Sequence, residues 1–294
     1  MHVLIVGCGY AGVPLGAELV RLGHEVFGLR RNPAAGGELT AAGIQPLIGD
    51  VTQPDSLAKL PRDFDWVVNC VAAGGDSDSY RQIYLQGTCN LIDWLAPHPP
   101  KKFVYTSSTS VYAQYDGSPV KESSPAEPLA ETSKILADTE KVLLDAVAQK
   151  KFPAVILRVA GIYGPERGHW FKQFLKDAAH IEGDGARFLN MIHRDDLVGC
   201  IIAALKSGRA GEIYNASDDE PVSQLHFFQW LAQAVDKPMP PVGPENLDDT
   251  RKRGVTNKRV SNRKLKMELG YRFKYPTFRQ GYSAELLRLD RAGK

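Results

Sequence analysis

The feature that most constrains the fold is a glycine turn close to the start of the chain. Residues 3–6 form an uncharged apolar run, which is typical of a buried strand. Gly7, Gly9 and Gly12 follow in the pattern G-x-G-x-x-G, and apolar residues at helical spacing come next. A strand, a glycine turn and a helix in this order predict the first unit of a dinucleotide-binding domain.

Each glycine of such a turn has its own physical reason. Gly7 permits the tight turn, Gly9 lets a pyrophosphate approach the backbone, and Gly12 lets the helix pack closely on the strand. The backbone amides that open the helix then face the phosphates, with the helix dipole behind them. We expect the whole loop, including Tyr10 and Ala11, to bind the cofactor. An ordinary strand-to-helix turn is the alternative.

The end of the second expected strand, residues 25–29, indicates which dinucleotide is bound. Arg30 follows that strand, 18 positions after Gly12, and Arg31 comes next. NAD-binding turns carry an acidic residue about 20 positions on, which holds the ribose 2′-hydroxyl, whereas an arginine there suits a 2′-phosphate. The sequence therefore favours NADP, with NAD as the alternative. Two solvated arginines that end a strand are the other interpretation.

Strands and helices alternate through the first half of the chain. The apolar runs predict strands at 3–6, 25–29, 44–50, 66–71, 102–108 and 154–158, and the helical spacings predict helices near 38–42, 80–95 and 133–148. Repeated strand-helix units predict an α/β fold of the Rossmann type, with a doubly wound parallel sheet and right-handed crossovers. Functional residues then gather at the carboxyl ends of the strands.

The alternation weakens after residue 162, which predicts two domains. Residues 1–162 are expected to form the dinucleotide-binding domain, to which 190–216 return. Residues 163–189 and 217–294 are expected to form a smaller α+β substrate-capping domain. The basic stretch 251–266 either holds a phosphorylated substrate or forms a solvated helix face beside acidic neighbours.

Composition excludes several classes of function. The formal net charge is +2, with 43% hydrophobic and 24% charged residues, which gives no general attraction to nucleic acid or to a membrane. No apolar run approaches the roughly 20 residues of a membrane span, and no basic segment precedes the first strand. The four cysteines are scattered, and neither they nor the histidines have metal-ligand spacing. We expect a cytoplasmic protein without a metal site.

Several segments, taken together and in order, have counterparts in a known superfamily. They are Asp50-Val51, the strand end Asn69-Cys70-Val71-Ala72-Ala73, Gly87-Thr88-Cys89-Asn90, and Thr106-Ser107-Ser108-Thr109-Ser110-Val111-Tyr112. Further matches lie at 157–165, 192–197 and 269–276. With them the chain resembles the extended short-chain dehydrogenase/reductase superfamily of nucleotide-sugar epimerases and dehydratases. The resemblance implies that Asp50 and Val51 contact the adenine, that Ala72 and Ala73 lie beneath the cofactor, and that Ser108 is the catalytic serine.

The chain also departs from the pattern of this superfamily. Its catalytic pair is Tyr-x-x-x-Lys on a helix; here Lys134 matches the lysine, which would bind the nicotinamide ribose, but Ala130 stands in place of the tyrosine. Tyr84 stands where the asparagine before G-T-x-N is expected, so it is the candidate for the missing phenol. These departures place the chain in an atypical subgroup.

One further cluster has two interpretations. His193, Asp195 and Asp196 could form a proton relay, but the resemblance implies that they join the two domains and cap a helix. Asp195 is the expected N-cap of a helix over 197–205.

Two functions remain open at this point. The first is an NADP-dependent oxidoreductase, or an epimerase/dehydratase-like enzyme, that uses hydride transfer on a small, polar, sugar-like substrate and acts as a monomer or homodimer. Ser108, Tyr84 and Lys134 would be its catalytic residues. The second is a non-catalytic NADP-binding redox sensor or regulatory protein that has lost the catalytic tyrosine. The identity of the substrate does not follow from the sequence.

Overall fold

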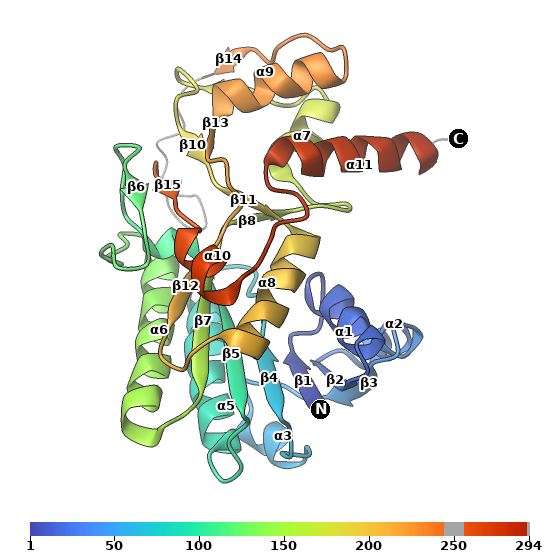
Figure 1. Ribbon diagram of the computed structural model, residues 1–294, viewed down its shortest axis with the longest axis vertical. Coiled ribbons are helices and arrows are strands. Elements are labelled where there is room, and N and C mark those ends of the chain that lie inside the picture. The colour runs from blue at the N-terminus through green and yellow to red at the C-terminus, as the bar shows by residue number, and fades with distance from the viewer. Residues whose placement is uncertain (244–255, 293–294) are drawn as a thin grey trace.

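The computed structural model describes residues 1–243 and 256–292. These residues form a seven-stranded parallel sheet in the order β12-β7-β5-β4-β1-β2-β3 (Figure 1). The strands are β1 His2–Val6, β2 Glu25–Arg30, β3 Gln45–Ile48, β4 Trp66–Asn69, β5 Lys102–Ser108, β7 Ala154–Val159 and β12 Ile213–Ala216. The predicted doubly wound parallel sheet is confirmed.

Helices bury both faces of the sheet. They are α1 Gly12–Arg21, α2 Gly36–Ala41, α3 Pro54–Ala58, α4 Ser77–Tyr80, α5 Gly87–Leu95, α6 Glu131–Lys150, α8 Arg194–Ser207 and α10 Arg263–Leu269. Successive residues of a strand point to opposite faces. In β1, accordingly, Val3 and Ile5 pack in one cluster with α1, α8 and α10, while Leu4 and Val6 pack in another with α3, α5 and α6. Burial on both faces explains why the strands have continuous apolar runs.

The strand order places the functional region. β1 lies between β2 and β4, so the chain winds away from β1 in both directions. In open parallel sheets, ligands bind at the carboxyl ends of the strands where the order reverses. Here that point is marked by Gly7 after β1 and by Cys70 after β4.

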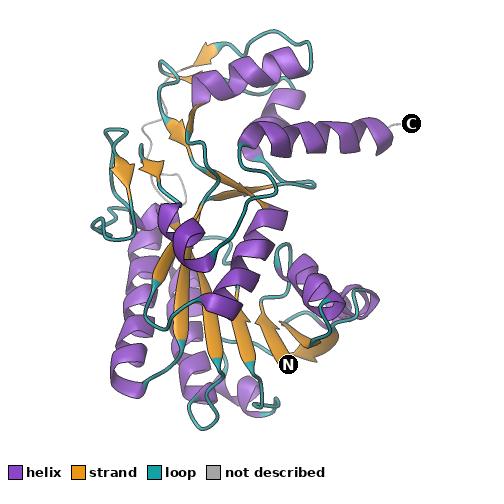
Figure 2. Ribbon diagram, in the orientation of Figure 1, coloured by secondary structure: helices purple, strands orange, loops and turns teal. Residues whose placement is uncertain are grey.

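Later segments form a second body above the sheet (Figure 2). Its helices are α7 His169–Leu175, α9 Gln224–Ala234 and α11 Phe278–Ala292, around a largely aromatic core that includes Phe171, Phe174, Phe227 and Tyr282. Its short strands pair as β8 Gly161–Tyr163 with β11 Met191–His193, β9 Ile181–Glu182 with β14 Val242–Gly243, and β10 Phe188–Leu189 with β13 Val222–Ser223. Strand β6 Pro119–Val120 pairs with β15 Arg259–Val260. There are also two short 3-10 helices, η1 Pro33–Ala35 and η3 Thr109–Val111.

The helix expected over 80–95 is not one regular helix. After α4 the chain makes a π-helix, η2, over Arg81–Gln86, and only then continues as α5. The apolar spacing of this segment does not distinguish a π turn from an α turn. π segments are rare and frequently lie at functional sites, so this one points to the region around Tyr84.

The start of α8 also differs from expectation. The N-cap is His193, whose Nδ1 accepts a hydrogen bond from the backbone N–H of Asp195 at 3.1 Å, so the prediction that Asp195 is the N-cap is wrong. Asp195 and Asp196 lie in the first turn, where carboxylates favour the helix dipole. Asp196 accepts hydrogen bonds from the Tyr271 hydroxyl at 2.7 Å and the Lys274 N–H at 2.6 Å. These contacts tie α8 to the C-terminal segment, which agrees with a structural role.

Candidate cofactor and substrate site

The glycine turn has the geometry that a dinucleotide needs. Gly7 has φ 77°, and a Cβ there would lie 2.6 Å from Val71 Cα. A Cβ on Gly12 would lie 3.2 Å from Ile5 Cγ2, which is close packing of α1 on β1. Gly9 differs from both, because the nearest atom to its Cβ would be 3.7 Å away. Packing therefore does not require glycine at position 9, and the missing side chain leaves room for a ligand.

Two cavities meet over this loop. The smaller, of about 280 Å³, is lined by Gly9, Arg30, Arg31 and Asp50, while the larger, of about 950 Å³, extends from the loop toward the second body. Gly7, Gly9, Val71 and Ala72 line both cavities. A ligand that crosses the loop can thus place one half in each.

The arginines of the smaller cavity are anchored differently. Arg30 Nη1 donates to Cys8 O at 2.6 Å and lies 3.9 Å from Glu38 Oε2, with 29% of its side chain exposed. Arg31 is 64% exposed and lies 3.9 Å from Asp50 Oδ2. The other oxygen of that carboxylate accepts from Thr52. Arg30 is therefore fixed against the glycine loop, whereas Arg31 extends toward solvent.

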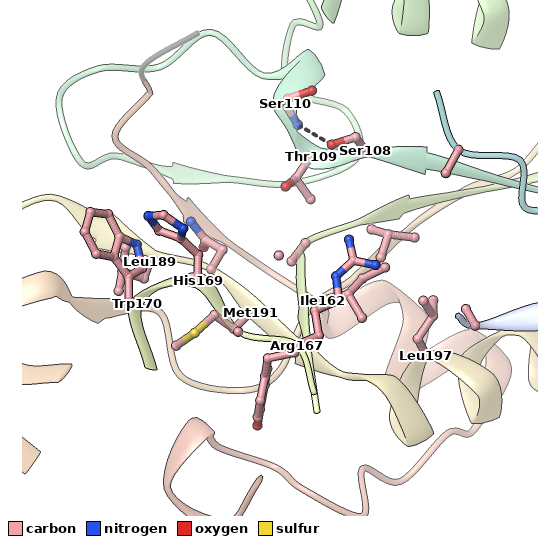
Figure 3. Close-up of a pocket in the computed structure, with 18 of the residues that line it drawn as sticks. Ser108, Thr109, Ser110, Ile162, Arg167, His169, Trp170, Leu189, Met191 and Leu197 are labelled. Atoms are coloured by element: carbon pink, nitrogen blue, oxygen red, sulfur yellow. Dashed lines mark hydrogen bonds between the residues drawn. The ribbon is translucent and has the colours of Figure 1, made fainter. Parts of the chain in front are cut away.

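Hydroxyl groups line one edge of the larger cavity (Figure 3). Ser108 ends β5, is buried, and accepts a hydrogen bond from the backbone N–H of Ser110 at 3.2 Å. Ser110 Oγ is buried and has no hydrogen-bond partner among the described residues. Thr109 lies between them and also lines the cavity. This edge can bond an oxygen of a ligand.

A buried ion pair supports the end of β5 behind these hydroxyls. Glu140 of α6 accepts from Ser107 Oγ at 2.5 Å and from Arg158 Nη2 of β7 at 2.7 Å. Both charged side chains are at most 5% exposed. Opposite charges with several hydrogen bonds offset the cost of burying each one. The pair therefore holds the carboxyl ends of β5 and β7 and α6 in one arrangement.

Tyr84 lies on the same cavity as Ser108. It sits in the π-helix, is 4% exposed, and packs against Tyr80 with 5.0 Å between ring centroids. Its hydroxyl accepts a hydrogen bond from the backbone N–H of Ala73 at 3.3 Å. A phenol that accepts one bond still has its proton to donate. The structure thus brings together Tyr84, Ser108 and the strand end at Ala72 and Ala73.

Among the described residues, the two positions of the expected Tyr-x-x-x-Lys pair, 130 and 134, do not lie on the cavity wall with the other candidates. Ala130 is the residue before α6 and has extended backbone angles. Lys134 is 53% exposed and lies 3.9 Å from Glu131 Oε2. Lys134 is not among the residues that line either cavity in the described part of the chain. The two other catalytic candidates are therefore on the cavity wall, and Lys134 is not.

Sequence reasoning missed Lys258. It lies in the basic stretch 251–266, of which the structure describes residues from Thr256 on, and it is 3% exposed on the wall of the larger cavity. For this residue the solvated interpretation is wrong. Its amine donates to Tyr112 O at 3.0 Å and to Thr256 Oγ1 at 2.7 Å, and both partners are uncharged. Burial lowers the pKa of this amine from 10.5 to about 7.

This lowered pKa gives Lys258 a measurable effect on stability. The unfolded chain binds the proton more tightly than the folded one, so the amine destabilises the fold increasingly as pH falls from 10.5 toward 7. We compare the free energy of unfolding of Lys258→Met with that of wild type. We expect this difference, variant minus wild type, to be about 1–3 kcal/mol larger at pH 6 than at pH 9. Urea denaturation of both proteins at the two pH values checks this. A difference independent of pH would mean that the amine keeps an ordinary pKa.

Two absences hold for the described part of the chain. It contains no group of three or more His, Cys, Asp or Glu side chains able to hold a metal ion. None of its helices is both long enough and apolar enough to cross a bilayer.

Comparison with known proteins adds to this geometry. The model of the NAD-dependent epimerase/dehydratase family matches residues 3–217. Protein YeeZ of Escherichia coli K12 is 29% identical over 286 residues, which cover 93% of this chain and 96% of that protein. Human dTDP-D-glucose 4,6-dehydratase is 28% identical over 207 residues, which cover 67% of this chain and 59% of the human protein.

Solved structures have the same fold. A conserved protein of unknown function from Silicibacter pomeroyi has a TM-score of 0.81 at 29% identity, over 98% of each chain. UDP-glucuronic acid 4-epimerase from Bacillus cereus, solved with UDP-glucuronic acid and NAD, has a TM-score of 0.85 over 99% of this chain and 100% of that one. At 23% identity, this second likeness shows the fold alone.

Proposed function

Because this chain belongs to the NAD-dependent epimerase/dehydratase family, we propose that it binds a nicotinamide dinucleotide across the glycine loop and transforms a small, polar, sugar-like substrate. The observation that carries the proposal is the meeting of two cavities at Gly9, where a side chain is absent without any packing reason. The adenosine half would occupy the smaller cavity, with Asp50 and Val51 at the adenine. The nicotinamide half and the substrate would occupy the larger one.

We propose NADP rather than NAD as the preferred cofactor. Arg30 is held beside the loop by Cys8 O and lines the smaller cavity together with Arg31. A guanidinium in this position suits a 2′-phosphate, with which it forms charge-assisted hydrogen bonds. The epimerase from Bacillus cereus was solved with NAD, which is the alternative cofactor.

Arg30→Asp tests this preference. The change replaces an attractive contact by a repulsive one, so we expect NADPH affinity to fall about 10- to 100-fold while NADH affinity changes little. Titration of both cofactors into both proteins measures the ratio. Glu38→Gln is the matched control, with an expected change in NADPH affinity of the opposite sign. It removes a carboxylate 3.9 Å from Arg30 and should therefore strengthen NADPH binding. Equal wild-type affinities for the two cofactors would refute the preference.

For the chemistry, we propose that Ser108 polarises the reacting oxygen and that Tyr84 moves its proton. A bound nicotinamide would supply the hydride acceptor or donor. The Tyr84 hydroxyl accepts a hydrogen bond from Ala73 N and still has its proton to donate. Lys134 would bind the nicotinamide ribose once its pairing with Glu131 opens. We place this enzyme in the cytoplasm, as a monomer or homodimer.

The second candidate is a cofactor-binding redox sensor or regulatory protein without catalysis. It is favoured by Ala130 in place of the tyrosine and by the exposed position of Lys134. Incubation of the purified protein with NADPH or NADP and a panel of carbonyl compounds and nucleotide sugars separates the two. Turnover supports the enzyme, and cofactor binding without turnover on any of them supports the sensor.

A further inference from the structure

A tight turn of the second body reaches the glycine loop. Gly164 N donates to Arg167 O at 3.0 Å, and Arg167 N donates to Gly164 O at 2.9 Å, which closes the turn. Gly164 and Gly168 have φ values of 140° and 143°, and Glu166 lies in the left-handed region at 59°. The turn is thus fixed by its own backbone, and it presents the Arg167 side chain from a defined position.

Tyr10 joins this turn to the loop. Its hydroxyl donates to Pro165 O at 3.0 Å, although the two residues are 155 positions apart. The guanidinium of Arg167 lies 5.0 Å from the centroid of the Tyr10 ring, and that of Arg194 lies 5.4 Å from it. Stacking of a guanidinium on an aromatic face restricts its position and leaves its N–H groups able to bond at the edge. Tyr10 therefore acts as a platform for both arginines.

The two arginines differ in charge compensation. Arg194 Nη2 donates to Asp195 Oδ1 at 3.2 Å, and Arg194 does not line the larger cavity among the described residues. Arg167 lines that cavity together with Gly9, Tyr10 and Ala11, and within the described residues no carboxylate pairs with it. Figure 3 shows Arg167 on the wall of this cavity together with Ile162, Leu197 and Trp170. An uncompensated positive charge thus faces the part of the loop where phosphates are expected.

We propose that Arg167 is a further cofactor-binding residue, whose guanidinium, held on the Tyr10 ring, binds the pyrophosphate of the dinucleotide. This inference rests on the proposed function. The planar fork of a guanidinium matches two phosphate oxygens, and it adds charge to the backbone amides at the start of α1. A second consequence follows from the Tyr10–Pro165 hydrogen bond. The bound pyrophosphate would link the glycine loop to the second body, so that cofactor binding orders one wall of the substrate cavity.

Fragments of the cofactor separate this contact from all others. NADH and ADP-ribose contain the pyrophosphate but no 2′-phosphate, whereas 2′-AMP contains the 2′-phosphate but no pyrophosphate. For Arg167→Gln we expect the affinity for NADH, NADPH and ADP-ribose to fall about 10-fold or more, while that for 2′-AMP stays within about twofold. Arg30→Asp should give a different pattern, with loss of affinity for NADPH and 2′-AMP but not for NADH or ADP-ribose. Isothermal titration calorimetry measures the affinity for all four ligands and does not depend on turnover.

Arg194→Gln is the matched control, since it removes a charge from the same ring at nearly the same distance. All four affinities should stay within about twofold of wild type, because Asp195 already neutralises Arg194. Unchanged NADH binding in Arg167→Gln overturns the inference, and so does an equal loss for 2′-AMP, which would mean a general change of charge or fold. If wild type bound none of the four, the proposed function would fail as well. Binding by wild type and by Arg167→Gln alike would refute only the role of Arg167.

Discussion

Gly9→Val is expected to lose dinucleotide binding by about 100-fold or more, which corresponds to about 2.7 kcal/mol, in a chain that remains folded. The structure gives both halves of this expectation. The nearest atoms to a Cβ on Gly9 are Arg30 Nη1 at 3.7 Å and Gly7 O at 3.8 Å, which is ordinary contact. The added Cβ therefore clashes with no backbone atom, but the side chain enters the space where both cavities join. Fluorescence titration with NADPH and a thermal melt measure the two effects.

A matched control comes from a glycine with an equally open environment away from the cavities. A Cβ on Gly37 would meet nothing within 4 Å, and Gly37 lines neither cavity. Gly37→Val should leave cofactor affinity unchanged and should leave stability unchanged or raise it by less than about 1 kcal/mol, because valine, although branched, is a better helix former than glycine. Gly9→Ala should fall between wild type and Gly9→Val. If Gly9→Val is folded and binds NADPH normally, the loop is only a turn, and the proposed function loses its main support.

Tyr84→Phe is expected to lower turnover about 100-fold while cofactor affinity is retained. The ring of Tyr84 packs on Tyr80, and this packing is unaffected by loss of the hydroxyl. What is lost is the proton donor on the wall shared with Ser108, together with the bond from Ala73 N. Steady-state kinetics with whichever substrate the panel yields, alongside NADPH titration, separate kcat from cofactor binding.

Tyr80→Phe serves as the comparison, since Tyr80 is fully buried one turn earlier and does not line the cavity. It should affect stability more than turnover. An unchanged rate in Tyr84→Phe would remove this phenol from the mechanism. If Ser108→Ala were equally harmless, chemistry of the family type would have no support at this edge, and the sensor would become the better explanation.

The parallel sheet was predictable because local sequence carries the information. The central strands are buried on both faces, so each one is a short apolar run, and β5 occupies the expected range 102–108. The glycine turn was equally local, because its requirements at Gly7 and Gly12 concern atoms of the adjoining strand and helix. Ser108 could be proposed as a site residue because it stands at the end of a predicted strand and matches a motif of the superfamily.

The rest of the site depends on contacts between distant segments. Arg167 and Lys258 reach the cavity from loops whose sequences show no periodic pattern, and Lys258 stands in a stretch whose charge suggested exposure. The N-cap of α8 was missed because a histidine nitrogen accepts the bond there, whereas Ser, Thr, Asp and Asn are the usual caps. For Arg167 and Lys258 the deciding contacts lie in distant segments, whereas at α8 the missed contact is local and involves an unusual capping residue.

The π-helix before α5 has a consequence for comparing relatives. A π turn holds one residue more than an α turn, so Arg81–Gln86 is equivalent to a single-residue insertion in an otherwise continuous helix. Each residue of an α-helix turns the chain by about 100°. Deletion of one residue, such as Ile83, would let α4 and α5 merge and would rotate everything before the deletion around the axis. The side chain that this segment places on the cavity wall can therefore change through an insertion or deletion with no substitution at all. In a relative without the extra residue, counting back from the glycine equivalent to Gly87 would identify the wrong side chain as the counterpart of Tyr84.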